Sequence, residues 1–391
     1  MVYLDNAATT KMKESVLSAM MPYFFENFGN ASSTYTTPGQ AARTALTEAR
    51  KTIAGCIGAT ERELYFTSGG SEADNWAIKG VMLKNKKKGN HIITTTIEHH
   101  AVLHTCEFLE KQGYKVTYLP VDEYGMVSVS DIENAITDET VLVSVMFANN
   151  EIGTINPIAE IGKLCRQKGV YFHTDAVQAT GAVEIDVEKQ NIDLLSMSAH
   201  KFHGPKGVGA LYVRKGVQIE NLIHGGAQES GKRATTENVA GIVGMAEALS
   251  EATANLEEKT AKITALRDYL IKTVLETVPY TRLNGHPEKR LPNNTSFCFK
   301  YIEGESLLLS LDMQGYVVSS GSACTSGSLD PSHVLLGIGL PHEIAHGSLR
   351  ASLSEFTTKE EIDSFIKALV PIVQRLRDMS PLYEGVDKAE N

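Results

Sequence analysis

A single lysine, Lys201, stands where a lysine has little reason to be unless it does chemistry. It follows the apolar run Leu194–Ser198, and the Gly204-Pro205 turn comes directly after it. Most surface lysines stand among other polar residues, whereas this one follows a predicted buried strand. Burial lowers the pKa of a lysine amine, and the neutral amine is a nucleophile. The placement therefore predicts a reactive lysine held by a backbone turn.

The segment TSGGSE, residues 67–72, joins a predicted strand to a predicted helix. Its two glycines permit a tight turn, and Ser71 suits the first turn of the helix. Because helix N-termini bind anions through their unpaired N–H groups, the segment is a candidate phosphate cradle. An ordinary capped turn is the alternative. The segment matches neither the GxGxxG nor the Walker pattern, so it does not imply a nucleotide.

Two further polar residues follow predicted strands. His99, in EHHAV, comes after the strand at 91–96, and a histidine there could stack on a flat ligand, transfer protons or be merely structural. Asp175, in HTDAVQ, ends another apolar strand. A carboxylate buried there needs a partner, which could be a cationic ring nitrogen, although a helix N-cap is the alternative.

Each of these four features follows the carboxyl end of a predicted strand, so all four fall at one edge of the same predicted sheet. Ligands of such sheets bind at that edge. A phosphate cradle, a stacking histidine, a carboxylate and an amine meet the four binding needs of pyridoxal 5'-phosphate. The arrangement therefore predicts a pyridoxal-phosphate site in which Lys201 forms the covalent link to the cofactor.

Strands and helices alternate from about residue 40 to 215, which predicts an α/β fold with a mostly parallel sheet between helices. One long helical pattern runs from about Glu237 to Thr277. After Pro279 the chain reads as a smaller α+β unit with a final amphipathic helix at about Lys359 to Arg377. We expect a large domain at 15–255 and a small domain formed by 1–14 together with 256–391.

Composition excludes several functional classes. The net charge of −10 and the dispersed basic residues argue against nucleic-acid binding, and no stretch approaches the ~20 apolar residues that a membrane span needs. No signal peptide is visible at the N-terminus. The five cysteines form no CxxC pair and no metal cluster, so we expect a cytoplasmic protein without a resident metal.

The chain resembles the cysteine desulfurases of the NifS/IscS family, within the fold-type I (aspartate aminotransferase-like) pyridoxal-phosphate enzymes. The matching motifs lie in order along nearly the whole chain: YLDNAATT (3–10), FGNASS (28–33), TSGGSEADN (67–75), EHHAV (98–102), ANNEIGT (148–154), HTDAVQ (173–178), SAHKFHGPKG (198–207), HGGAQE (224–229), TEN (236–238) and SSGSACTSGSLDPSHVL (319–335). The resemblance implies a seven-stranded, mostly parallel sheet in the large domain.

The resemblance also implies a set of cofactor-binding residues: Gly70, Ser71, His99, Asn150, Asp175, Gln178, Ser198, His200, Lys201 and Thr236. In this family His99 would stack on the ring and move a proton, Asp175 would pair with the ring nitrogen, and Gln178 would bind the phenolic oxygen. Thr236 would reach the phosphate of the partner subunit, which implies a homodimer. Asn150 and Arg350 would bind the substrate carboxylate, and a bidentate arginine suits that task.

Cys324 lies in a run of small, turn-forming residues, which predicts a loop and sets it apart from Cys298 in SFCFK. The resemblance makes Cys324 the catalytic cysteine, whose thiolate takes sulfur from L-cysteine and leaves L-alanine. The persulfide would then serve an iron–sulfur scaffold or another acceptor protein, and Cys324 could ligate a cluster transiently with that scaffold. Cys56, Cys106 and Cys165 are predicted packing residues.

Three other interpretations stay open from the sequence: another class V aminotransferase-like enzyme, a selenocysteine lyase, and a catalytically silent subunit that binds the cofactor. The first would use Lys201 and Asp175 in the same way but would not need Cys324. The third is disfavoured by the presence of Lys201, Asp175, Arg350 and Cys324 together.

Overall fold

The computed structural model describes residues 1–320 and 331–383. Within this part of the chain, seven strands form one sheet in the order β2-β8-β7-β6-β5-β3-β4. Their bounds are β2 Leu64–Thr67, β3 His91–Thr95, β4 Lys115–Leu119, β5 Thr140–Ser144, β6 Tyr171–Asp175, β7 Leu194–Ser198 and β8 Gly209–Val213. The predicted alternation of strands and helices, and the seven-stranded sheet implied by the family resemblance, are confirmed.

Strand direction gathers the predicted site at one edge of this sheet. The pairs among β7, β6, β5, β3 and β4 are parallel, whereas β8 runs antiparallel to both β7 and β2. Because both neighbours oppose β8, β2 points the same way as the parallel strands. The carboxyl ends of six strands therefore lie at one edge, where such sheets bind ligands.

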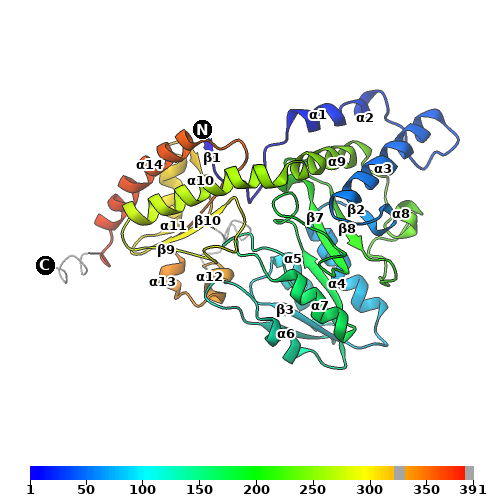
Figure 1. Cartoon of the computed structure of the whole chain (residues 1–391), viewed down its shortest axis with the longest axis horizontal. Coiled ribbons are helices and arrows are strands. Elements are labelled where there is room, and N and C mark those ends of the chain that lie inside the picture. Colours follow the sequence, from blue (N-terminus) through cyan, green and yellow to red (C-terminus); the bar gives the residue numbers. More distant parts are fainter. Residues whose placement is uncertain (321–330, 384–391) are drawn as a thin grey trace.

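Helices cover both faces of the sheet (Figure 1). One face packs against α4 (Gly70–Lys84) and α5 (His100–Glu110), and the other against α3 (Thr37–Cys56), α7 (Ile158–Lys168) and α9 (Val239–Thr253). Neighbouring residues on a strand serve opposite faces, so Leu194 joins the α4 side and Leu195 the α7 side. This double coverage explains why β7 reads as a continuous apolar run.

A smaller unit contains the rest of the described strands. β9 (Thr281–Leu283), β10 (Asn294–Phe299) and β12 (Ser348–Ser352) form an antiparallel sheet in the order β12-β10-β9. At the other end of the chain, β1 (Val2–Tyr3) pairs in parallel with β11 (Tyr316–Val317). The helices of this unit are α10 Leu256–Thr277, α11 Gly304–Asp312, α12 His333–Gly337, α13 His342–Ala345 and α14 Lys359–Asp378.

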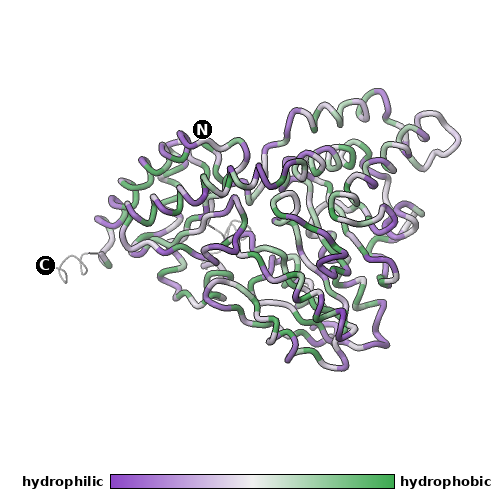
Figure 2. The backbone as a smooth tube through the Cα atoms, in the orientation of Figure 1, coloured by the Kyte–Doolittle hydropathy of each residue, from purple (hydrophilic) through white to green (hydrophobic). Residues whose placement is uncertain are grey.

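The N-terminal strand and the C-terminal helix share one apolar core. Leu4 lies in a buried cluster with side chains of α10, β10, β12 and α14, and Figure 2 shows apolar positions on the inner side of these helices. The remaining α-helices of the described residues are α1 (Glu14–Met20), α2 (Pro22–Phe25), α6 (Val129–Ala135) and α8 (Gln228–Gly231), and single 3-10 turns lie at Glu61–Glu63 and Ala199–Lys201. No helix in the ranges 1–320 and 331–383 is long and apolar enough to cross a membrane.

The prediction of one long helix from Glu237 to Thr277 was wrong. The chain forms two helices there, α9 and α10, because Ala254 adopts an extended conformation and Asn255 a left-handed one (φ 54°). Asparagine tolerates the left-handed region better than most residues, and apolar periodicity alone does not reveal such a break. α9 packs on the large sheet, whereas α10 packs on the small one.

Candidate functional site

A cavity of about 310 Å³ opens at the carboxyl edge of the large sheet, facing the small unit. It is lined by Ala7, Ala8, Gly70, Ser71, Asp74, His99, Met146, Ala148, Asn150, Asp175, Val177, Gln178, Ser198, His200, Lys201 and Arg350. Two larger hollows, of about 690 and 700 Å³, lie elsewhere and contain none of the predicted site residues. The chemistry therefore converges on the smaller, more enclosed cavity.

The structure brings together all but two of the predicted site residues. Thr236 is exposed, does not line the cavity and lies in the segment between α8 and α9. Cys324 lies outside the described residues. Among the described cysteines, burial raises the pKa of Cys106 and Cys165 to about 12 and that of Cys298 to about 11, so these thiols stay protonated.

The N-terminus of α4 is a candidate anion cradle. Gly69, at the N-cap position, offers no side-chain cap to the first turn, and a Cβ placed on Gly70 would lie only 2.6 Å from Val177 Cγ2. The same point lies 3.7 Å from Ser198 Cβ. Glycine thus leaves the helix end open toward Ser198, and the hydroxyls of Ser71 and Ser198 with the N–H groups of the helix make a donor set that fits a phosphate.

Three buried carboxyl groups lie behind this cradle. Burial raises the pKa of Asp175, Asp74 and Glu98, in the last case to about 8. Asp175 Oδ1 accepts a hydrogen bond from Val177 N at 2.9 Å, and Asp175 is adjacent to the cavity. Asp74 Oδ1 has no hydrogen-bond partner among the described residues. Buried carboxylates that lie near one another repel, so a cation beside them is stabilising. A protonated ring nitrogen beside Asp175 would supply that positive charge.

His99 is held as a neutral imidazole. It caps α5, and its Nδ1 accepts a hydrogen bond from Ala101 N at 3.1 Å. The proton of the neutral ring therefore sits on Nε2. Burial lowers the pKa of His99, and nearby Lys201 lowers it further against the opposing effect of Asp175. A neutral, oriented ring at the wall of the cavity can stack on a flat ligand and can donate from Nε2.

Lys201 follows β7 on a single 3-10 turn (Ala199–Lys201), as the strand-and-turn pattern predicted. Its Nζ donates to the carbonyl oxygens of Ala7 at 2.5 Å and Ala8 at 2.9 Å. Gln178 Nε2 donates to the same Ala7 oxygen at 2.9 Å. The amine thus lies at the cavity wall, beside a backbone segment near the N-terminus of the chain.

That N-terminal segment, residues 5–10, is a site element that sequence reasoning missed. Besides its contacts to Lys201, it lies against His200, whose Nδ1 is 3.1 Å from Thr9 Oγ1 and whose carbonyl accepts from Thr10 N at 3.0 Å. Burial and the neighbouring lysine lower the pKa of His200 to about 4, so its ring is neutral. The motif YLDNAATT contains this segment. Its contacts to Lys201 are made by backbone carbonyl groups, however, and because every residue type has these groups the sequence did not indicate the contacts.

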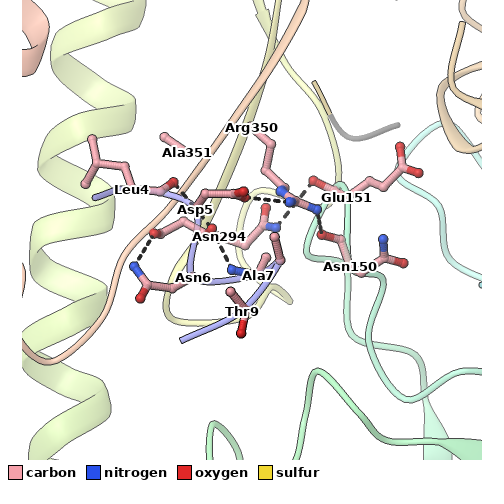
Figure 3. A network of polar contacts seen from close by, with 12 residues as sticks. Leu4, Asp5, Asn6, Ala7, Thr9, Asn150, Glu151, Asn294, Arg350 and Ala351 are labelled. Atoms are coloured by element: carbon pink, nitrogen blue, oxygen red, sulfur yellow. Dashed lines mark hydrogen bonds and ion pairs between the residues drawn. The ribbon is translucent and has the colours of Figure 1, made fainter. Parts of the chain in front are cut away.

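Arg350, on β12, reaches the cavity from the small unit (Figure 3). Its Nη1 donates to the carbonyl oxygen of Asn150 at 2.9 Å, and its Nη2 donates to Asp5 Oδ1 at 2.8 Å. Its Nε is buried with no hydrogen-bond partner among the described residues. This guanidinium is 3% exposed and still has donors to offer, which suits a receptor for a carboxylate.

The described residues contain no group of three or more histidine, cysteine or acidic side chains that could hold a metal ion. The donor set of the cavity is instead one of hydroxyl groups, a helix end, neutral imidazoles, a buried acid and two cationic side chains. These are the groups that pyridoxal 5'-phosphate requires.

Comparison with known proteins agrees with this geometry. Residues 2–365 match the model of the aminotransferase class V family. The chain is 62% identical over 389 residues to cysteine desulfurase IscS of Clostridium botulinum (strain Hall), covering 99% of this chain and 98% of that protein. It is 59% identical over 381 residues to cysteine desulfurase IscS of Methanosarcina thermophila, covering 97% and 94%.

Solved structures show the same fold. A NifS-like protein superposes with a TM-score of 0.90 at 40% identity, covering 96% of this chain and 100% of that one. The structure described as SspA in complex with cysteine superposes with a TM-score of 0.81 at 36% identity, covering 92% of this chain and 100% of that one.

Proposed function

The chain belongs to the aminotransferase class V family and, within it, to the cysteine desulfurases of the IscS/NifS group, and we propose that it converts L-cysteine to L-alanine with transfer of the sulfur to Cys324. The overall reaction is balanced: L-cysteine and the Cys324 thiol give L-alanine and a Cys324 persulfide. The substrate assignment is supported by the relatives' names and by the similar SspA structure, which contains cysteine.

Pyridoxal 5'-phosphate, which the class V family implies, supplies an electron sink for the substrate's α-carbon when bound. We assign its phosphate to the N-terminus of α4 together with Ser71, Ser198 and His200. Asp175 would keep the ring nitrogen protonated, and Gln178 would bind the phenolic oxygen. His99 lines the same cavity and would stack on the ring. The cradle at Gly70 and the buried carboxylate of Asp175 support this placement.

Lys201 moves the proton in this mechanism. Its Nζ, when neutral, removes the proton from the substrate's α-carbon and then holds it for return to the product. The carbonyl oxygens of Ala7 and Ala8 orient the amine and stabilise its protonated form. His99 Nε2 is the second site that can move a proton.

Arg350 binds the substrate carboxylate, with Asn150 beside it. The carbonyl of Asn150 accepts a hydrogen bond from one nitrogen of the guanidinium and holds Arg350 at the cavity wall. The side-chain amide of Asn150 contributes a further polar group to the same wall.

Sulfur transfer needs a thiolate, because the thiol is a poor nucleophile. The Cys324 thiolate attacks the substrate sulfur, and an iron–sulfur scaffold or another acceptor protein then takes the persulfide sulfur in the cytoplasm. Cys324 could ligate a cluster transiently in that complex. We further propose a homodimer in which Thr236 of each subunit binds the phosphate in the partner's site.

The observation that carries the proposal is the convergence of Asp175, His99, Lys201 and Arg350 on one cavity. The test is to incubate the purified protein with pyridoxal phosphate, L-cysteine and a thiol reductant, and to measure sulfide and alanine together. Equal amounts of both, lost in Lys201→Ala, support the proposal. Alanine that requires a keto acid and appears without sulfide would instead indicate an aminotransferase, and activity confined to selenocysteine would indicate a lyase.

A further inference from the structure

The substrate-carboxylate receptor already holds a carboxylate that belongs to the protein. Asp5 Oδ1 accepts a hydrogen bond from Arg350 Nη2 at 2.8 Å (Figure 3). Among the described residues, Asp5 is the ion-pair partner of Arg350. We propose that Asp5 is an internal competitor, which pairs with Arg350 until the carboxylate of the substrate displaces it. This inference rests on the proposed role of Arg350.

Asp5 makes only one of the two hydrogen bonds that a carboxylate can accept from one side of the Arg350 guanidinium. A carboxylate that binds side-on takes hydrogen bonds from Nε and one Nη together, which is the strong, bidentate arrangement. Asp5 accepts from Nη2 alone, and Nε stays buried without a partner among the described residues. A free carboxylate can satisfy both nitrogens, so it gains a hydrogen bond that Asp5 does not make. The pairing with Asp5 is therefore weak enough to be exchanged.

The other nearby acid does not take this role. Glu151 is 4% exposed, and its Oε2 accepts from the Ser332 hydroxyl rather than from Arg350. Burial raises the pKa of Glu151, which favours its neutral form. Asp5, in contrast, has a side chain that is 15% exposed. Its charge can thus move toward water when another carboxylate arrives.

The backbone around Asp5 is anchored independently of this ion pair. Asn6 Nδ2 donates to the carbonyl of Ser352 at 2.8 Å, and Ala7 N donates to the Ser352 hydroxyl at 2.8 Å. Thr10 N donates to the carbonyl of His200 at 3.0 Å. The Asp5 side chain can therefore leave Arg350 by rotation about its own bonds, while the segment that contacts Lys201 stays in place.

The internal carboxylate has two consequences for binding. It keeps a buried guanidinium paired before substrate binds, which avoids the cost of an uncompensated buried charge. It also lowers the affinity for carboxylate ligands, because each of them must replace Asp5. Ligands without a carboxylate do not compete with Asp5 and are not affected.

The test compares two ligands of the holoenzyme that differ in the carboxylate. 3-Mercaptopropionate has the thiol and the carboxylate of cysteine but no amine, and cysteamine has the thiol and the amine but no carboxylate. Calorimetry gives the Kd of each for the wild type, Asp5→Asn and Arg350→Gln. Asp268→Asn is the matched control, because Asp268 pairs with buried Arg267 at 2.7 Å, away from the cavity.

We expect Asp5→Asn to bind 3-mercaptopropionate about fivefold more tightly, as removal of a competing, partly exposed ion pair implies. Its Kd for cysteamine stays unchanged, as do both values in Asp268→Asn. If Asp5→Asn binds 3-mercaptopropionate no more tightly than the wild type while Arg350→Gln loses binding, Asp5 is not a competitor. Arg350 would then still be the carboxylate receptor. Undiminished binding to Arg350→Gln overturns both.

Discussion

At the scale of single residues, charge decides which groups can act. Burial raises the pKa of Asp175, Asp74 and Glu98. Asp175 raises the pKa of both other groups further, and Glu98 also raises that of Asp74. Buried carboxylates so close together cannot all ionise. Burial raises the pKa of Asp175, and nearby His99 and Lys201 oppose that rise. A cationic ring nitrogen beside Asp175 would act in the same direction and favour its ionisation.

The first prediction concerns Asp175. The Asp175→Asn variant removes the charge that pairs with the ring nitrogen but keeps the side-chain shape. We expect kcat for alanine formation to fall about 10²–10³-fold, as is typical when one preorganised electrostatic partner is removed. Steady-state kinetics measure this loss, with Asp268→Asn as the control and circular dichroism to verify folding. A variant with nearly normal kcat would refute the pairing of Asp175 with the ring.

The second prediction concerns the pH dependence of stability. Burial raises the pKa of Glu98 from its ordinary value of 4.5 to about 8. A carboxyl group whose pKa is higher in the folded state stabilises the fold below 4.5, and that contribution is lost as the pH rises toward 8. Glu98→Gln mimics the protonated acid, so the free energy of unfolding of the variant should rise relative to the wild type across this range.

Urea unfolding of both proteins at several pH values measures the difference. Glu107 is exposed on α5, the helix that follows Glu98, and Glu107→Gln is the control for a Glu→Gln substitution at the surface. A difference between Glu98→Gln and the wild type that is constant with pH would show that Glu98 is ionised in the folded protein.

At the scale of secondary-structure elements, the order of strands and helices was predictable, and the contacts between distant segments were not. The strand at 194–198 and the final helix at about 359–377 lie where the apolar patterns predicted, because buried strands and amphipathic helices have strong sequence patterns. The break at Asn255 and the wall formed by residues 5–10 depend on backbone conformation and backbone carbonyls. Residue types report on these features only weakly.

Some residues of the candidate site could be recognised from the sequence, and others could not. Lys201, Asp175 and His99 are chemically reactive types at strand ends, so their placement carried a signal before any family was considered. Asp74 and Asp5 read as ordinary polar residues. Their importance comes from burial and from the partner that faces them, which only the fold provides.

The third prediction concerns the open N-terminus of α4. Gly70→Ala places a methyl group 2.6 Å from Val177 Cγ2 and narrows the anion cradle. We expect the affinity for pyridoxal phosphate to fall about tenfold, the usual scale of overpacking. Equilibrium dialysis of the apoprotein measures the Kd. Gly55→Ala is the control, because a Cβ at Gly55 has nothing within 4 Å, and equal Kd values for both variants would contradict the cradle.

At the scale of the whole molecule, the cavity is built from both units of the chain. The large sheet supplies Asp175 and Lys201, and β12 of the small unit supplies Arg350. The N-terminal segment links them, since Asp5 contacts Arg350 while Ala7 and Ala8 contact Lys201. Relative motion of the two units would therefore change the distance between the amine and the carboxylate receptor.

The fourth prediction concerns assembly. Thr236 is exposed and away from its own cavity, as expected for a residue that serves a partner. Native mass spectrometry should give twice the chain mass of 42.5 kDa. Mixed dimers of Lys201→Ala and Thr236→Val should contain one intact site and regain about a quarter of wild-type activity, since half of the dimers are hybrids. A monomeric mass, or no gain on mixing, would rule out the shared site.

The proposed transfer of sulfur from cysteine to Cys324 can be observed as a change in the mass of the protein. The holoenzyme is mixed with a slight excess of L-cysteine without reductant, quenched, and analysed by peptide mass spectrometry. We expect the peptide containing Cys324 to gain the mass of one sulfur atom while alanine forms in equal amount. We expect Cys324→Ser to form neither the persulfide nor alanine. Alanine and sulfide produced at the normal rate by Cys324→Ser would show that Cys324 does not accept the sulfur.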